Sequence, residues 1–227
     1  MDMGLNNKTA LVTGSTRGIG KAIAIELAKE GVNVLINGRN DEEVERTVNE
    51  IKSAYPSTFP QNATADIANP QQREALFEKY PSVDILVNNM GMYEMMQYED
   101  VDDDIWENYF RTNVLAANGL SKFYLPNMLE NNFGRIIFIA SEEAIMPSGQ
   151  MPQYCMTKTM LLSLAKSLSK LTKGREVTIN TIMPGPTLSE NVYQIIDSMF
   201  PNQGMSFSEK EKAFMTTNLP QSEIQRF

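Results

Sequence analysis

Histidine is absent from the 227 residues, and cysteine occurs only once, as Cys155. Without histidine the chain lacks the commonest general base and metal ligand, so any acid–base chemistry has to use other side chains. A single cysteine cannot form an intrachain disulfide. We therefore expect neither a disulfide framework nor a metal site.

Basic residues are also in the minority, with 20 Lys and Arg against 28 Asp and Glu, a formal net charge of −8. This charge opposes binding to nucleic-acid phosphates. Residues 1–6 contain no basic region followed by an apolar stretch, so neither a secretory signal nor a membrane anchor is visible. We expect a cytoplasmic protein without nucleic-acid or membrane partners, folded as one domain over residues 1–227.

Short, continuous apolar runs are typical of strands that are buried on both faces of a parallel sheet. A shorter strand at 61–65 would complete a first βαβαβ half, because Asn69-Pro70 behind it suits a helix start. The five longer runs lie at 10–12, 34–36, 85–87, 136–139 and 177–182.

Helical spacing fills the intervals between these strands. The alternation predicts an α/β fold with a doubly wound parallel sheet of Rossmann-type order and helices on both faces. After Pro184 the pattern becomes irregular, and residues 185–220 are interpreted as a partly apolar flap over a substrate pocket. The predicted helices lie at 19–30, 42–54, 71–80, around 106–120 and at 154–172.

A glycine-rich turn follows the first strand directly: Thr13-Gly14-Ser15-Thr16-Arg17-Gly18-Ile19-Gly20 opens into a helix. Glycines permit close approach of the backbone, and a helix start offers unpaired N–H groups and a positive dipole end to a pyrophosphate. The structural alternative is a tight strand-to-helix connection without a ligand.

The spacing TGxxxGxG resembles that of the short-chain dehydrogenase/reductase family. Asn88-Asn89-Met90-Gly91 resembles the family's NNAG motif, with methionine in place of alanine, and Tyr154-Cys155-Met156-Thr157-Lys158 matches its YxxxK motif. Ser141 precedes Tyr154 by 13 positions, as the family's serine does. Asn113 matches the family's helix asparagine and Pro184-Gly185 its turn after the sixth strand, so the resemblance spans nearly the whole chain.

The resemblance implies an oxidoreductase that transfers a hydride between a nicotinamide dinucleotide and a carbonyl or alcohol. Tyr154 would act as general acid or base, Ser141 would bind the substrate oxygen, and Lys158 would hold the nicotinamide ribose. Asn113 would position a water in a proton relay behind Lys158. Cofactor contacts are expected from Gly14, Ser15, Thr16, Arg17, Gly18, Ile19, Gly20, Arg39, Asp66, Ile67, Asn88, Gly91, Tyr154, Lys158, Pro184, Gly185 and Thr187.

Residues four apart share one face of a helix, so Tyr154 and Lys158 can approach the same ligand. A neighbouring ammonium and the positive nicotinamide ring favour the phenolate, which predicts a lowered pKa for Tyr154. Taken singly, each candidate has a structural alternative: Ser141 as a loop hydroxyl, Asn113 as a polar group at a helix bend, and Tyr154 with Lys158 as an amphipathic surface pair. Cys155 is interpreted as a packing residue.

The end of the second strand reads Ile36-Asn37-Gly38-Arg39-Asn40. An acid there usually binds the adenosine ribose of NAD, whereas an arginine accommodates the 2′-phosphate of NADP. Because no acid occupies Asn37 or Gly38, and Arg39 is joined by Arg17, we predict NADP in preference to NAD. The alternative is that both arginines are solvated and offset by the acids at 41–43.

The substrate pocket is expected to be closed by residues 92–96, by the loop 142–151 and by the flap. Five methionines there predict a largely apolar substrate, although ordinary packing explains any one of them equally well. Glu142 and Glu143 make an anionic substrate less attractive. The methionines are Met92, Met95, Met96, Met146 and Met151.

Helices corresponding to 106–120 and 154–172 form the dimer bundle in similar proteins, so a homodimer or homotetramer is expected. The leucines that would broaden the second helix's apolar surface are Leu161, Leu162, Leu164, Leu168 and Leu171.

Similar proteins usually continue beyond the flap into a final strand, which this chain lacks. Its absence would leave the strand near Val177 as an open edge or require a partner to cover it. The alternatives to an active enzyme are therefore a non-catalytic dinucleotide-binding protein or an α/β interaction module.

Overall fold

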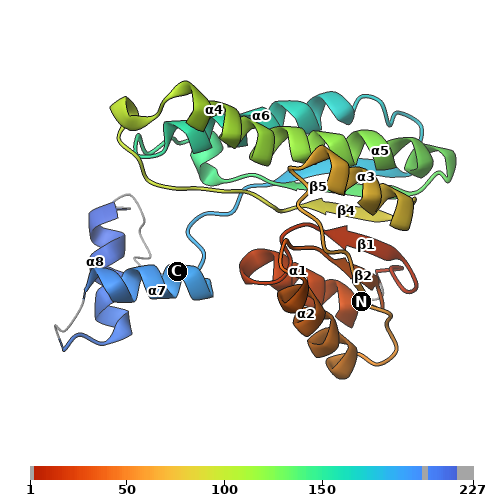
Figure 1. Ribbon diagram of the computed structural model, residues 1–227, viewed down its shortest axis with the longest axis horizontal. Coiled ribbons are helices and arrows are strands. Elements are labelled where there is room, and N and C mark those ends of the chain that lie inside the picture. Colours follow the sequence, from red (N-terminus) through yellow and green to blue (C-terminus); the bar gives the residue numbers. More distant parts are fainter. Residues whose placement is uncertain (1–2, 201–203, 219–227) are drawn as a thin grey trace. The chain divides into compact units, whose positions relative to one another are not determined.

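The computed structural model describes residues 3–200 and 204–218, and the chain divides into two compact units, Met1–Pro184 and Gly185–Phe227. The first unit contains a six-stranded parallel sheet of order β3-β2-β1-β4-β5-β6 (Figure 1). This order confirms the predicted doubly wound fold. The strands are β1 (Thr9–Val12), β2 (Asn33–Ile36), β3 (Gln61–Asn62), β4 (Ile85–Asn88), β5 (Gly134–Ile139) and β6 (Val177–Ile182).

The sheet changes winding direction at β1, which pairs with β2 on one side and with β4 on the other. Val12 lies opposite Ile36 in the first pair and opposite Val87 in the second. In open α/β sheets ligands bind beyond the carboxyl ends of the strands at such a switch point. The glycine-rich turn leaves β1 at this place, so the topology brings the first sequence motif to the expected ligand crevice.

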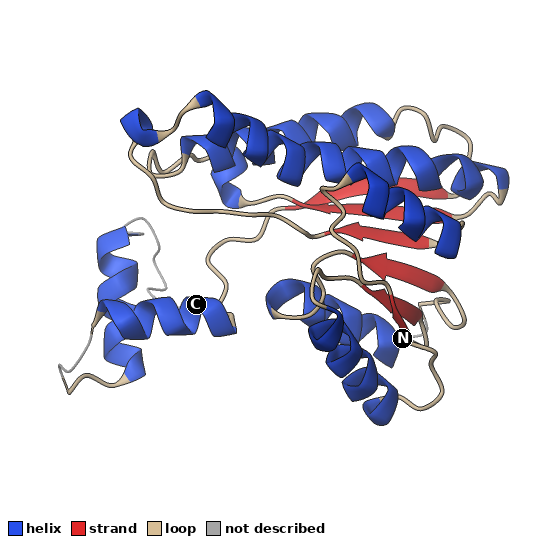
Figure 2. Cartoon of the chain, viewed as in Figure 1, coloured by secondary structure: helices blue, strands red, loops and turns tan. Residues whose placement is uncertain are grey.

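Two layers of helices cover the sheet (Figures 1 and 2). Side chains alternate between the faces of a strand, so Leu11 packs into one core and its neighbours Ala10 and Val12 into the other. Helices α1 (Gly18–Lys29) and α2 (Asp41–Ala54) cover one face. The other face carries α3 (Pro70–Lys79), α4 (Asp103–Tyr109), α5 (Ala116–Glu130) and α6 (Pro152–Leu168).

The helix over 106–120 differs from its prediction. It begins at Asp103 in α4, passes through the π-helical segment η2 (Phe110–Leu115) and continues as α5 to Glu130. A π-helical turn holds one residue more than an α-helical turn, and such turns are frequent at functional sites. No feature of the apolar spacing indicated this insertion, which contains the candidate residue Asn113.

The predicted strand at 61–65 is present but shorter. Only Gln61 and Asn62 are strand residues, although the N–H groups of Ala63 and Ala65 still bond to the carbonyls of Ile36 and Gly38. Helix α6 begins at Pro152, two residues before its predicted start, because proline suits the first helical position. A short 3₁₀ turn, η3 (Glu142–Ala144), follows β5, and another, η1 (Tyr98–Asp100), precedes α4.

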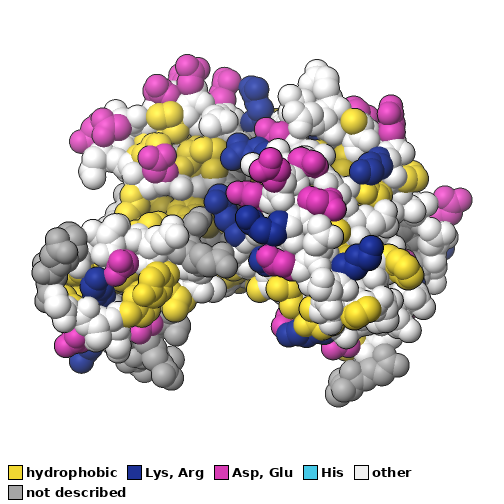
Figure 3. Space-filling view, turned by 60° about the horizontal axis from the view of Figure 1, so that its bottom comes forward, with side chains coloured by type: hydrophobic (Ala, Val, Ile, Leu, Met, Phe, Trp, Pro, Cys, Tyr) yellow, Lys and Arg dark blue, Asp and Glu magenta, His cyan; other side chains and the backbone are white. Residues whose placement is uncertain are grey.

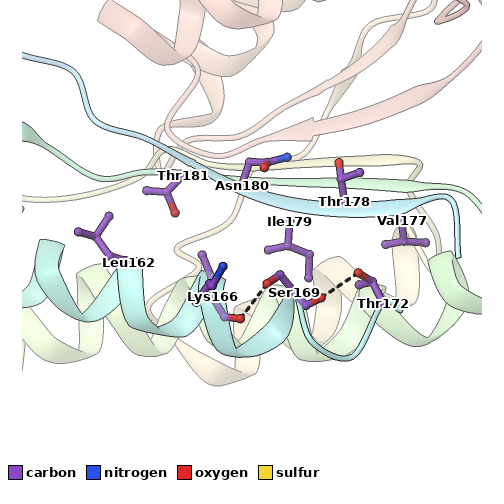
Figure 4. A pocket seen from close by; sticks show the side chains of 10 residues that line it. Leu162, Lys166, Ser169, Thr172, Val177, Thr178, Ile179, Asn180 and Thr181 are labelled. Atoms are coloured by element: carbon purple, nitrogen blue, oxygen red, sulfur yellow. Dashed lines mark hydrogen bonds between the residues drawn. The ribbon is translucent and has the colours of Figure 1, made fainter. Parts of the chain in front are cut away.

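Within the described residues β6 is the outer strand of the sheet. A groove runs along it and is lined by β6 and α6, with Ile179 and Thr178 on the strand and Leu162 and Ser169 on the helix side (Figure 4). This agrees with the open edge expected near Val177.

The second unit contains α7 (Glu190–Met199) and α8 (Phe207–Asn218). The rings of Tyr193 and Phe207 stack with centroids 4.4 Å apart and join the two helices. The predicted flap falls mostly on this unit, while residues 201–203 and 219–227 lie outside the described part. No helix in that part is long and apolar enough to cross a membrane.

Candidate active site

The glycine-rich turn has the backbone that the motif predicted. Gly14 and Gly18 have φ angles of +62° and +55°, a region that side chains other than glycine rarely adopt. Ser15 is fully buried, and its hydroxyl donates to the Val12 carbonyl at 2.7 Å. The serine side chain therefore stabilises the turn from its buried side, and the backbone of the turn is the part that can contact a ligand.

Gly20 and Asn89 hold the turn against the fourth strand. A Cβ on Gly20 would fall far inside contact distance of the Gly14 carbonyl oxygen and the Asn89 amide. The Asn89 amide donates to the carbonyls of Thr13 at 2.8 Å and Gly14 at 3.1 Å. The second asparagine of the NNMG motif is thus a brace for the phosphate turn, a role that the sequence analysis did not assign.

The start of α1 is open for an anion. Its N-cap residue, Arg17, makes no side-chain capping bond, and the first turn contains no acid. Helix α2 is the opposite case: the Asn40 side chain caps the N–H of Glu43, and three acids occupy the first turn. Unpaired N–H groups and a positive dipole end therefore remain available at α1, beside the glycine turn.

Arg17 and Arg39 are both exposed, and neither forms an ion pair with any of the residues that the structure describes. Asp41, which was considered as a counter-charge for them, instead accepts hydrogen bonds from Asn62 and Thr64, each at 2.9 Å. These two bonds hold the pKa of Asp41 below its usual value. On the face shown in Figure 3, Lys and Arg side chains gather in a patch bordered by acidic side chains.

Asn37 is buried and links three segments, which makes it a site residue that sequence reasoning missed. Its amide donates to the carbonyls of Ala63 at 2.8 Å and Ala65 at 3.1 Å. Its own backbone N–H donates to the Ser15 hydroxyl at 2.9 Å. At the next position, a Cβ on Gly38 would lie 2.8 Å from the Thr16 methyl group. Asn37 therefore points into the protein, and Arg39 is the exposed side chain at this strand end.

The predicted adenine segment is fixed by α3. The N–H of Asp66 donates to the Gln72 side chain at 2.7 Å, and Ile67 is buried while its carbonyl accepts from Arg73 at 2.8 Å. Asn88 is buried as well. Its amide donates to Ser121 at 3.2 Å, but its Oδ1 has no hydrogen-bond partner in the described structure.

Gly91, Asn113 and Lys158 come together from three different elements. A Cβ on Gly91 would lie 3.3 Å from the Lys158 Nζ and 3.4 Å from the Asn113 Oδ1. The Asn113 Oδ1 accepts the N–H of Met92 at 2.8 Å, and its Nδ2 donates to the Met92 carbonyl at 3.1 Å and the Thr157 hydroxyl at 3.0 Å. Thr157, the residue before Lys158, thus joins the π-helical segment to α6.

Lys158 is buried, which removes the alternative of an amphipathic surface pair. Its ammonium donates to the Ile139 carbonyl at 2.8 Å and lies 5.5 Å from the centroid of the Tyr154 ring. Burial lowers the pKa of Lys158 from 10.5 to about 8. A buried charged lysine is costly for folding, and groups with such a perturbed pKa cluster at functional sites.

Tyr154 and Ser141 meet beside this lysine. Burial raises the pKa of Tyr154, a hydrogen bond with Ser141 lowers it, and the negative charge of Glu143 raises it. The predicted lowering is therefore wrong for the groups that the chain itself supplies, because loss of solvation outweighs the favourable neighbours. Within the described protein the Tyr154 hydroxyl keeps its proton at neutral pH.

The carboxyl end of β6 reaches the same place. The Pro184 carbonyl accepts the N–H of Glu142 at 3.0 Å, directly after Ser141. Gly185 and Thr187, two further predicted cofactor contacts, belong to the second unit, where the Thr187 hydroxyl donates to the Gly185 carbonyl at 3.0 Å.

The backbone of residues 92–96 is held at every second position. Asn113 binds both polar groups of Met92, the Gln153 amide donates to the Glu94 carbonyl at 3.0 Å, and the N–H of Met96 donates to the Gln150 carbonyl at 3.1 Å. The ring of Tyr93 lies 6.0 Å from that of Tyr154. This segment therefore forms a fixed wall beside the tyrosine.

No group of His, Cys, Asp and Glu suited to a metal ion occurs among residues 3–200 and 204–218. Cys155 is buried, and its thiol donates to the Glu143 carboxylate at 3.0 Å. Burial, together with Glu143, raises the pKa of this thiol to about 12. The thiol is therefore a packed, protonated group, as interpreted from the sequence.

Residues 8–199 match the protein family described as short chain dehydrogenase. The uncharacterized oxidoreductase YvaG of Bacillus subtilis is 48% identical over 226 residues, covering 100% of this chain and 86% of YvaG. D-beta-hydroxybutyrate dehydrogenase of Cupriavidus necator is 30% identical over 97% of this chain and 86% of that protein. L-Sorbose reductase from Gluconobacter frateurii, solved in complex with NADPH and L-sorbose, matches with a TM-score of 0.92 at 28% identity, covering 100% and 86% of the two chains.

Proposed function

The chain belongs to the short-chain dehydrogenase family, and from this premise we propose that it is an NADP-dependent oxidoreductase that interconverts a carbonyl and an alcohol. In this proposal Tyr154 is the general acid for reduction and the general base for oxidation. The observation that carries it is the meeting of Tyr154 with Ser141 and with the buried ammonium of Lys158.

The residues at the switch point fit a dinucleotide. The glycine turn and the uncapped start of α1 suit a pyrophosphate, which is anionic and accepts backbone N–H bonds. The unpartnered Oδ1 of the buried Asn88 suits a hydroxyl donor, such as a ribose. Gly91 leaves open a space that a Cβ would fill, next to Lys158 and Asn113. We assign the pyrophosphate to the first site and the ribose groups to the other two.

NADP is favoured over NAD by charge. The exposed guanidiniums of Arg17 and Arg39 have no carboxylate partner within the described residues and can pair with a 2′-phosphate. The similar L-sorbose reductase was solved with NADPH, which supports the same choice for this chain.

The chain's own residues arrange the proton transfer. Ser141 donates a hydrogen bond to the substrate carbonyl, and Tyr154 delivers its proton to the same oxygen as the hydride arrives at the carbon. Bound NADPH supplies that hydride. Lys158, cationic below a pKa of about 8, stabilises the phenolate that remains on Tyr154. Asn113 keeps one lone pair on Oδ1 beyond its bond from Met92, so it can still take part in a proton path behind Lys158.

The substrate wall is rich in exposed apolar side chains, which supports a largely apolar substrate. Two of these side chains lie on the fixed wall and two on the loop after Ser141. The exposed fractions are 53% for Tyr93, 59% for Met95, 64% for Ile145 and 66% for Met146. Side chains of this kind on both segments that flank Tyr154 indicate a hydrophobic rim.

Self-association through η2, α5 and α6 is supported by exposed apolar side chains there, those of Phe110, Leu115, Phe123 and Met156. The leucine stripe contributes less than expected, because Leu161 is buried in the core and Leu164 and Leu168 pack against it. A homodimer through these helices is our proposal, and sedimentation equilibrium that fits a monomer at all concentrations would contradict it.

The decisive experiment follows NADPH consumption over a panel of ketones and aldehydes, with Tyr154→Phe as the matched variant. We expect turnover by the native chain and a loss of about 10²-fold or more in Tyr154→Phe, which lacks only the proton-carrying hydroxyl. NADPH binding, followed by fluorescence, should weaken far less than turnover in the variant. Equal turnover by both proteins would refute the assigned role of Tyr154.

A further inference from the structure

Glu143 is held in a fixed place next to the proposed proton donor. Its Oε2 accepts the Cys155 thiol at 3.0 Å and the N–H of Ser148 at 2.8 Å. Cys155 follows Tyr154 directly on α6, whereas Ser148 lies in the loop after Ser141. Because both elements bind the same oxygen, the carboxylate cannot turn away from the site without breaking two hydrogen bonds.

The η3 turn that carries Glu143 is itself fastened to α6. The Thr159 hydroxyl donates to the Ala144 carbonyl at 2.8 Å, and the N–H of Glu143 donates to the Ser141 hydroxyl oxygen at 3.2 Å. The position of the carboxylate relative to Ser141 and Tyr154 is therefore set by the fold.

Several groups act on the Tyr154 hydroxyl from neighbouring elements. Tyr93 acts from the fixed wall, Ser141 and Glu143 from the loop after β5, and Cys155 from α6, while the Lys158 ammonium lies 5.5 Å from the centroid of the Tyr154 ring. Cys155 is neutral at physiological pH, because the pKa of its thiol is about 12. The ammonium of Lys158 already donates to the Ile139 carbonyl.

Among the described groups that act on the Tyr154 hydroxyl, none is a cation that could pair with a carboxylate carried by a substrate. The negative charge of Glu143 acts on the Tyr154 hydroxyl, beside which the proposed mechanism places the reacting carbonyl. Glu143 also acts on its neighbour on η3, because its negative charge, together with burial, raises the pKa of Glu142.

We propose that Glu143 determines substrate specificity by reserving the site for uncharged carbonyl compounds and rejecting those with a carboxylate near the reacting carbon. The inference rests on the proposed oxidoreductase function and names the substrate class of that same site. Two like charges several ångströms apart in a partly solvated site repel strongly enough to change relative turnover about tenfold.

Ethyl acetoacetate and acetoacetate test the proposal as a matched pair, because they share the ketone and differ in ester against carboxylate. We expect the native chain to favour the ester. Glu143→Gln keeps the shape and an acceptor oxygen, and should raise the ratio of kcat/KM for acetoacetate to that for the ester about tenfold. Glu142→Gln is the control and should change this ratio less than about threefold, since Glu142 is not among the groups that act on Tyr154. An unchanged ratio in Glu143→Gln overturns the proposal.

A second measurement is independent of turnover. The ultraviolet difference titration of Tyr154, referenced to Tyr154→Phe, should show ionisation at lower pH in Glu143→Gln, because a negative charge that disfavours the phenolate has been removed. Identical titrations would mean that the charge of Glu143 does not reach the Tyr154 hydroxyl, and the proposal would fail. A native chain that reduces neither ketoester nor other neutral ketones would instead refute the proposed function, while the titration would still decide the role of Glu143.

Discussion

Replacing Asn37 with aspartate tests whether this residue is a structural hub, that is, a buried side chain whose hydrogen bonds join several segments, or a cofactor contact. The native amide donates to two carbonyl oxygens, those of Ala63 and Ala65, in a buried place. A carboxylate at this position has no proton to donate, and it would lie against two carbonyl oxygens that carry partial negative charge. We expect Asn37→Asp to destabilise the fold, although it introduces an acid at the strand end where NAD-dependent relatives of this fold class usually carry one.

The cost has two parts. The protonated carboxyl of the variant can donate only one of the two hydrogen bonds, which loses about 1 kcal/mol. Burial beside two carbonyls should raise the pKa of the new carboxyl by about 2–3 units, and each unit costs about 1.4 kcal/mol at neutral pH. The total is about 4–5 kcal/mol at about pH 7.5.

The pH dependence gives the sign of the effect. Because the pKa of the folded state is raised, the ionisation part of the penalty is complete above that pKa and disappears as the pH falls toward the unfolded value of about 3.9, while the cost of the lost hydrogen bond remains. The deficit in the free energy of unfolding should therefore shrink by about 2 kcal/mol between about pH 7.5 and pH 5.

Urea denaturation of the native chain and Asn37→Asp at both pH values measures this deficit. Asn40→Asp is the matched control, because Asn40 is the exposed N-cap of α2 and aspartate caps a helix equally well. It should change stability by less than about 0.5 kcal/mol. An Asn37→Asp variant within about 1 kcal/mol of the native chain, or a deficit independent of pH, would refute the hub interpretation.

Three further outcomes are expected. Lys158→Met should abolish turnover yet raise the free energy of unfolding by about 1–2 kcal/mol at neutral pH. The lysine pKa, lowered to about 8, reflects a desolvation cost that is present below that pH and is lost as the pH rises toward 10.5. Urea denaturation at two pH values checks this, and a less stable variant would contradict it. Cys155, buried with a pKa of about 12, should not react with a thiol reagent in the native chain and should react fully after denaturation; rapid native labelling would count against the described packing. Arg39→Asp should shift the ratio of kcat/KM for NADPH to that for NADH by about tenfold or more toward NADH, through loss of a phosphate partner; an unchanged ratio would exclude Arg39 as a 2′-phosphate contact.

The regular part of the fold was predictable because its signals are local. Apolar runs marked the long strands, and Asn69-Pro70 marked the start of α3, where the Asn69 side chain accepts the N–H groups of two following residues. The motifs also predicted that segments from different strand ends meet, and Gly14 lies beside Met90 while Gly91 lies beside Lys158, because a parallel sheet brings the ends of its strands to one edge.

What could not be predicted depends on the direction and solvation of side chains. The sequence shows an asparagine at position 37 but not that it turns inward, and it gives no sign of the extra residue in η2. For the groups of the chain itself the pKa of Tyr154 is raised and not lowered, because motif spacing reveals nearby charges but not how much water burial removes. The bracing roles of Asn89 and Thr157 were missed because their partners lie on other elements.

The hydrogen bonds along residues 92–96 bear on how a substrate is selected. Fixing the backbone of one residue costs about 1–2 kcal/mol of conformational entropy. At Met92, Glu94 and Met96 that ordering is complete once the chain has folded, since three separate elements hold the backbone there. Substrate binding therefore does not have to order this segment. Related ketones should associate at nearly the same rate, and the fixed shape of the wall should discriminate between them through their dissociation rates.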